Sequence, residues 1–146
     1  STPNHVFYHQ RYWAYMLIHD ARVRPAGAQA RNDMQRKTAQ IRRVLEPFRG
    51  PDCTWLPYYS PSPFTSPNPD VYISAWHRPD TDEYLLAVAY FGRKPERMDA
   101  RITVKVEGKR QAENPLTLQT TPFTNGTLTV PIGFEEFRLV RLTAVD

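Results

Sequence analysis

Hydrophobic positions in the first third of the chain recur at helical spacing. Residues 29–48 place apolar side chains every three or four residues, the period of an amphipathic α-helix. Residues 5–20 are apolar almost all round, and a helix of that kind needs partners on several sides. A β-strand is the rival interpretation of 5–20, because tyrosine and tryptophan favour strands, but the run is long for one strand. Breaks at Pro25–Gly27 and at Gly50-Pro51 predict a pair of helices.

From residue 71 onward the hydrophobic period is two, which predicts β-strands. Strands are expected at 71–77, 84–91, 101–107, 127–132 and 137–143, with a weaker one at 116–120. Residues 84–91 do not alternate, so both faces of this strand should be covered, one by a sandwich core and the other by the helices. We therefore predict an α+β fold in which an N-terminal helical pair packs on an antiparallel β-sandwich.

A proline-rich stretch lies between these two parts. Residues 51–70 contain six of the 14 prolines, a density that excludes a helix interior or a central strand. Aromatic residues are interleaved with the prolines, which a flexible tether would not need. We predict an ordered, extended connector, so that the chain divides into a helical segment (1–50), this connector (51–70) and an antiparallel β-sandwich (71–146).

Composition narrows the classes of partner. No apolar run approaches the roughly 20 residues that span a bilayer, so no membrane partner is expected. The net charge of +4 is uneven: residues 1–50 carry nine basic and three acidic side chains, and the rest carry ten and twelve. We interpret the basic excess as a solvated or domain-contacting helix face. Nucleic-acid binding through the second helix is the alternative, and it is the less favoured one.

The histidines and the cysteine do not form a recognisable site. His5 and His9 have the i, i+4 spacing that shares a helix face, but no glutamate follows the first histidine, and His19 lies ten residues beyond. Cys53 has no histidine nearby in sequence, and the isolated glycines form no phosphate-binding loop. We expect no metal site and no cofactor.

The carboxylates also lack a catalytic arrangement. The acidic turn Asp80–Glu83 has neither the glycine nor the terminal glutamate of a calcium loop. Glu135 and Glu136 are adjacent, so in a strand they point to opposite faces, and we interpret them as exposed loop charges. The sequence therefore shows no catalytic constellation, and it leaves open whether the chain belongs to an enzyme.

Aromatic residues are the remaining candidates for function. Trp55, Tyr58, Tyr59 and Trp76 are candidate carbohydrate-binding residues, because an exposed ring can cover the flat apolar side of a sugar. That function requires at least two of these rings to be exposed and coplanar. The favoured alternative is that the rings attach the connector and the helices to the sheet. Asn125-Gly126 matches both a hairpin turn and a glycosylation acceptor, and we favour the turn.

Three short segments carry a family resemblance: 55–59 (Trp-Leu-Pro-Tyr-Tyr), 70–78 (Asp-Val-Tyr-Ile-Ser-Ala-Trp-His-Arg) and 84–90 (Tyr-Leu-Leu-Ala-Val-Ala-Tyr). They resemble the C-terminal β-sandwich region of bacterial glycoside-hydrolase-like proteins that have a (β/α)-barrel and are related to β-N-acetylgalactosaminidases. Tyr59 departs from the tryptophan expected there, whereas residues 137–140 resemble the closing strand.

The resemblance implies a non-catalytic accessory domain, because the catalytic carboxylates of such enzymes lie in the barrel. It also implies a secreted or periplasmic protein whose partner is the missing barrel domain or another protein surface. If the chain is a fragment of this kind, the first helix should expose a patch vacated by that domain. Burial of Phe7, Trp13 and Leu17 together would count against this expectation.

Overall fold

The computed structural model describes residues 11, 13–19 and 32–146. Residues 13–18 are helical, and α2 spans Asn32–Leu45 before a 3-10 turn, η1, at Glu46–Phe48. The strands are β1 (Thr54–Leu56), β2 (Phe64–Thr65), β3 (Val71–Arg78), β4 (Glu83–Tyr90), β5 (Arg97–Val104), β6 (Arg110–Glu113), β7 (Phe123–Thr124), β8 (Thr127–Gly133) and β9 (Glu136–Ala144).

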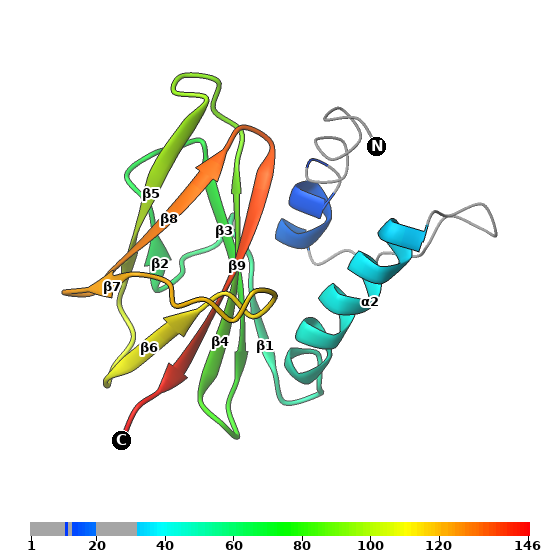
Figure 1. The fold of residues 1–146 in the computed structure, drawn as a ribbon. Coiled ribbons are helices and arrows are strands. Elements are labelled where there is room, and N and C mark those ends of the chain that lie inside the picture. The colour runs from blue at the N-terminus through cyan, green and yellow to red at the C-terminus, as the bar shows by residue number, and fades with distance from the viewer. Residues whose placement is uncertain (1–10, 12, 20–31) are drawn as a thin grey trace.

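Two antiparallel sheets form a sandwich. The first has the order β1-β3-β4-β9-β6, and the second has the order β2-β5-β8-β7. The helices lie on the outer side of the first sheet (Figure 1). The predicted α+β architecture, with helices packed on an antiparallel sandwich, is confirmed; the proposed division into 1–50, 51–70 and 71–146 remains a prediction.

Strand β4 is buried on both faces, as its lack of alternation predicts. Leu86, Val88 and Tyr90 belong to the core between the two sheets. Leu85, Ala87 and Ala89 belong to a second core under the helices. The second core also contains the following helical and turn residues: Trp13, Ala14, Leu17, Ile18, Ile41, Leu45 and Phe48.

A buried serine joins three segments of the chain. The Oγ of Ser74, in β3, donates a hydrogen bond to the carbonyl oxygen of Ile18 at 2.6 Å. The same oxygen accepts a hydrogen bond from the backbone N–H of Tyr58 at 3.0 Å. Ser74 is therefore bonded to the end of the first helix and to the proline-rich connector. Because the last carbonyls of a helix have no partner within it, this contact satisfies a group that burial would otherwise leave unpaired.

Several predicted elements differ from the observed ones. The strand predicted at 116–120 is wrong, because the Asn114 side-chain oxygen accepts hydrogen bonds from the N–H groups of Leu116 and Thr117 and folds this segment into a turn. The strand predicted at 101–107 begins four residues earlier and ends three residues earlier, at 97–104. The Asn125-Gly126 turn between β7 and β8 is confirmed, with φ of 53° and 76°, as a type I′ hairpin requires.

The first helix is only partly described. Residues 13–18 confirm a helix within the predicted range 5–20, whereas 5–10 lie outside the described residues. Trp13 and Leu17 are buried within the chain. Phe7, the third residue of this expectation, lies outside the described residues, and so do His5 and His9. The exposed patch on the first helix therefore remains a prediction.

Candidate functional site

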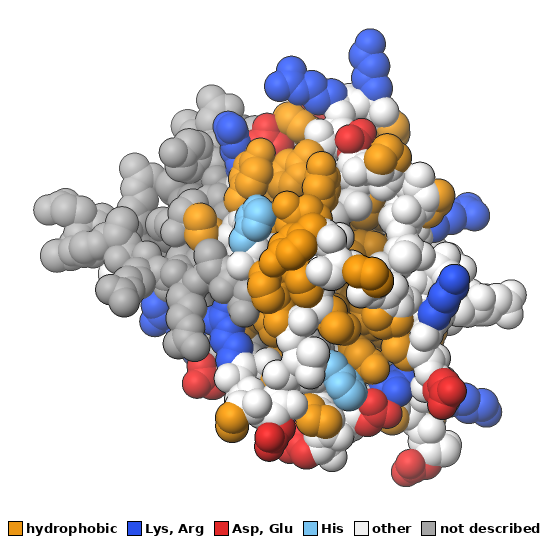
Figure 2. All heavy atoms as spheres, turned by 180° about the vertical axis from the view of Figure 1, so that it is seen from behind, with side chains coloured by type: hydrophobic (Ala, Val, Ile, Leu, Met, Phe, Trp, Pro, Cys, Tyr) orange, Lys and Arg blue, Asp and Glu red, His pale blue; other side chains and the backbone are white. Residues whose placement is uncertain are grey.

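The predicted sugar-binding residues occupy different depths of the fold. Tyr59 is 65% exposed, whereas Trp55 and Tyr58 are half-buried. Trp76 is 2% exposed and lies in the second core, so its ring presents no free face. Figure 2 shows hydrophobic side chains gathered in a band down one face of the molecule.

The rings of the connector meet edge to face. Tyr59 lies at 82° to Trp55 and at 89° to Tyr58, with centroids 6.1 and 5.3 Å apart. Tyr58 in turn meets Tyr72 of β3 at 73° and 5.1 Å. Such perpendicular rings do not form a flat platform, and they attach the connector to β3 in a favourable geometry. Carbohydrate binding by Trp55, Tyr58, Tyr59 and Trp76 remains a prediction.

The ring contacts continue from the connector to the first helix. Tyr72 contacts Phe91 at 5.4 Å, and Phe91 stacks on Tyr15 at 4.6 Å. His19 meets Tyr58 edge to face at 5.5 Å. One chain of aromatic contacts therefore links the helix, the end of β4, the start of β3 and the connector.

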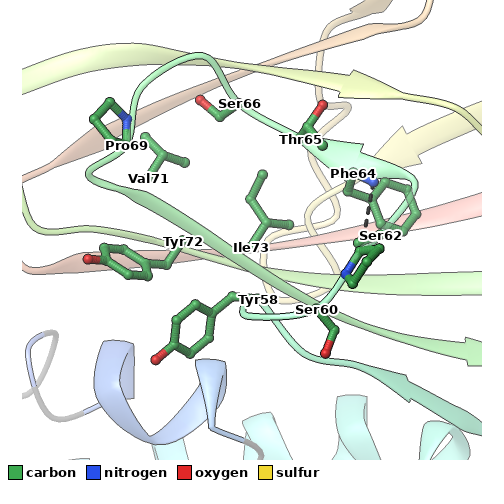
Figure 3. Close-up of a pocket in the computed structure, with 11 residues that line it drawn as sticks. Tyr58, Ser60, Ser62, Phe64, Thr65, Ser66, Pro69, Val71, Tyr72 and Ile73 are labelled. Carbon is green, nitrogen blue, oxygen red and sulfur yellow. Dashed lines mark hydrogen bonds between the residues drawn. The ribbon is translucent and has the colours of Figure 1, made fainter.

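A pocket opens beside these rings, at the edge of the sandwich. It has a volume of about 510 Å³ and is lined by residues of the connector and by the first half of β3 (Figure 3). The sequence did not single out this pocket as a site. A signal was present in the cluster of serines and a threonine between the prolines of 60–66, which turn propensity alone explains equally well.

The acidic turn between β3 and β4 is held by an arginine and a histidine of the protein. Arg110 Nη2 lies 2.7 Å from Asp82 Oδ2, and His77 Nε2 lies 3.0 Å from Asp82 Oδ1. The hydrogen bond from His77 and the charge of Arg110 lower the pKa of the Asp82 carboxyl below its usual value, against the opposing effect of burial. Within the described residues, no group of three or more His, Cys, Asp or Glu side chains is placed to hold a metal ion.

The interpretation of Glu135 and Glu136 as exposed loop charges is wrong. Glu135 is buried and forms an ion pair with Arg11 at 2.6 Å. Glu136 starts β9, accepts a hydrogen bond from Gly133 N at 2.7 Å and pairs with Arg138 at 2.9 Å. Burial acts to raise the pKa of Glu136, but hydrogen bonds outweigh it and the pKa is lowered. Glu135 lies in a sharp turn, with φ of 60°, and the carboxylates of this turn pair with arginines both distant in sequence (Arg11 and Arg97) and near (Arg138).

The remaining candidate residues are Cys53 and the arginines of α2. Cys53 is half-buried, and its Sγ lies 3.5 Å from the carbonyl oxygen of Pro47. Arg42 and Arg43 are exposed on α2, whereas Ile41 and Leu45 face the sheet. This arrangement is typical of a solvated helix face, and nucleic-acid binding remains a prediction. No helix in the described part of the chain has the length and hydrophobicity to cross a membrane.

Comparison with known proteins gives similarity at the level of fold. No family model matches the sequence, and no curated protein matches it. An α-amylase from Anoxybacillus, described as a new glycosyl hydrolase subclass, aligns with a TM-score of 0.55 over 82% of this chain at 8% identity. A GH27 β-L-arabinopyranosidase from Geobacillus stearothermophilus, in complex with arabinose, aligns with a TM-score of 0.47 over 54% of this chain at 12% identity.

The aligned part is a minor share of each of these larger proteins. It covers 24% of the amylase chain and 18% of the arabinopyranosidase chain. At these identities the likeness concerns architecture alone. Both of these distant structural neighbours are glycoside hydrolases. The α-amylase shares the fold of this chain over about a quarter of its own length.

Proposed function

We propose that the chain is a non-catalytic accessory β-sandwich domain of a carbohydrate-active enzyme. The observation that supports it is the fold, which recurs as 24% of the length of an Anoxybacillus α-amylase. A fold alone does not determine a function, so the state of the acidic residues is the second support. Asp82, Glu113 and Glu136 each pair with arginine, which is typical of structural carboxylates.

The proposed partner is a (β/α)-barrel domain. Two large aromatic side chains are exposed in the part of the chain that the structure describes, Tyr15 at 44% and Tyr59 at 65%. They lie at opposite ends of the aromatic contact chain, which runs through Phe91, Tyr72 and Tyr58. A surface with exposed tyrosines is well suited to contact another domain, because their rings add apolar area with little loss of side-chain entropy.

The coding sequence on both sides of these 146 residues tests this proposal. We expect it to encode a barrel-length domain in the same reading frame. Flanking sequence that encodes no such domain would contradict the proposal.

A second test concerns the absence of catalysis. The isolated chain should release no product from chromogenic glycosides under conditions in which a full-length glycosidase is active. Turnover that survives removal of contaminating enzymes would show that the chain is catalytic and would contradict an accessory role.

A further inference from the structure

The pocket beside the connector exists because two short strands leave an edge of the sandwich uncovered. β1 pairs only with residues 75–77 of β3, and β2 pairs only with residues 103–104 of β5. The chain between β1 and β2 therefore crosses from one sheet to the other, and neither strand covers the first half of β3. The resulting pocket of about 510 Å³ is within the size range of small-molecule sites in proteins, roughly 300–1,000 Å³.

The lining of this pocket is uncharged and rich in hydroxyl groups. None of its eleven residues is Asp, Glu, Lys, Arg or His. Six of them carry a hydroxyl group: Tyr58, Ser60, Ser62, Thr65, Ser66 and Tyr72. A carboxylate or phosphate ligand would be bound here without a cation to compensate its lost hydration, which is costly. The lining thus favours a neutral ligand with many hydroxyl groups of its own.

Most of these hydroxyl groups are available to a ligand. Among the residues that the structure describes, the hydroxyls of Tyr58, Ser60, Thr65 and Tyr72 have no hydrogen-bond partner in the protein. Ser62 Oγ and Ser66 Oγ each accept one backbone N–H at 3.2 Å, from Phe64 and Asn68, and their O–H groups remain to donate.

Polar and apolar groups are separated within the pocket. Figure 3 shows Tyr58, Tyr72 and Ser60 along the side nearer the helices, and Thr65 and Ser66 along the opposite side. Val71 and Ile73 point into the sandwich core, whereas Tyr72 lies on the opposite, helix-facing side of β3 together with Tyr58. The hydroxyl groups of the pocket therefore lie on both sides of the uncovered edge of β3.

We propose that this pocket binds a neutral oligosaccharide across the uncovered edge of β3, with the hydroxyl groups of Tyr58 and Tyr72 as specific contacts. This site differs from a platform formed by Trp55, Tyr59 and Trp76. It also goes beyond the accessory role proposed above, because that role needs no ligand, and the two proposals fail separately.

Isothermal titration of the 146-residue chain with oligosaccharides tests this site. The panel contains neutral oligomers of glucose, galactose, xylose and N-acetylhexosamines, and an oligogalacturonide of equal length as the acidic counterpart. We expect at least one neutral oligomer to bind, and the oligogalacturonide to bind at least about tenfold more weakly. Absence of heat for every neutral oligomer, or tighter binding of the acidic one, would overturn the proposal.

Matched variants locate the binding within the molecule. Tyr58→Phe and Tyr72→Phe remove only a hydroxyl group, and each should weaken binding about three- to tenfold. Tyr59→Phe is the control, since this neighbouring ring is exposed and does not line the pocket. Circular dichroism spectra equal to that of the parent chain establish that each variant is folded. If Tyr59→Phe weakens binding as much as the pocket variants, or if the pocket variants bind normally, the sugar does not occupy this pocket.

Discussion

The two faces of β4 are buried by different partners and are built from different side chains. The inner face presents Leu86, Val88 and Tyr90 to a second sheet, whose ladder of hydrogen bonds fixes its position. The outer face presents one leucine and two alanines, Ala87 and Ala89, to the helices. Small side chains on this face let the helical layer come close to the sheet.

The difference concerns how each layer is attached. The inner layer is a sheet of the sandwich, whereas the outer layer is attached through side-chain packing, the Ser74 hydrogen bond to Ile18 and the ion pair of Arg11 with Glu135. A helical layer can move into the space left by a deleted side chain more readily than two packed sheets can. We infer that the helices separate from the first sheet more easily than the two sheets separate from each other.

The largest expected effect compares two neighbouring leucines. Leu85 and Leu86 are both 0% exposed but face opposite sides of β4. Leu86→Ala should lower the free energy of unfolding by about 3 to 4 kcal/mol, and Leu85→Ala by about 2 to 3 kcal/mol, because the helices can move into the smaller volume. Chemical denaturation measures both changes, with the partly exposed Val145→Ala as a control near zero. A larger loss for Leu85→Ala would show that the outer core is the more rigid one.

The next effect comes from added volume on each side. Ala87→Leu places extra atoms under the helices and should cost about 1 to 3 kcal/mol. Amide hydrogen exchange should quicken in α2 while β4 and β9 stay protected, because the helical layer gives way first. Ala100→Leu adds the same volume inside the sandwich and should reduce protection in the helices and strands together. Equal loss of protection throughout the Ala87→Leu variant would contradict a separable outer layer.

How far the sequence predicts this fold depends on what determines each element. Strands β3, β4, β8 and β9 are predicted well because their residue patterns match the layers that bury them. β6 (Arg110–Glu113) has Ala112 as its one apolar residue, and it is a strand because it pairs with the end of β9. Pairing between distant segments of this kind is not visible in a local pattern.

The same limit applies to the candidate site. The aromatic connector is visible in the sequence, but the perpendicular arrangement of its rings and the burial of Trp76 follow from the register of β1 against β3. The pocket depends on where β1 and β2 end, which is a property of pairing. The buried Ser74 gives no signal in a run of apolar residues, although it holds both the connector and the first helix.

Removal of the Ser74 hydroxyl tests the polar attachment of the outer layer. Ser74→Ala leaves the Ile18 carbonyl and the Tyr58 N–H without this partner, and should cost about 1 to 2 kcal/mol. Thermal unfolding measures the loss, and Ser66→Ala is the matched control, because Ser66 Oγ accepts one bond from Asn68, two residues away. A cost for Ser74→Ala no greater than that of the control would show that the Ser74 hydrogen bonds contribute nothing measurable to the attachment of the helices.

The smallest effect is expected at the turn beyond both layers, where Asp82 contacts His77 and Arg110. The pKa of Asp82 is lowered in the folded chain, so its contribution to stability is fully present above the ordinary value of 3.8 and is lost as the pH falls through the lower folded value. Because the carboxyl is half exposed, this contribution should stay below about 1 kcal/mol. Asp82→Asn keeps a residue type that tolerates its φ of 52° and removes the charge, so urea unfolding from pH 6 to pH 3 should show a weaker acid dependence. Asp80→Asn removes a more exposed carboxylate that contacts only the nearby Arg78 and Thr81, and it should leave the acid dependence unchanged. If Asp82→Asn and the parent chain lose stability equally with acid, the acid dependence arises from other carboxylates, such as the paired ones around β9, and the turn contributes nothing to it.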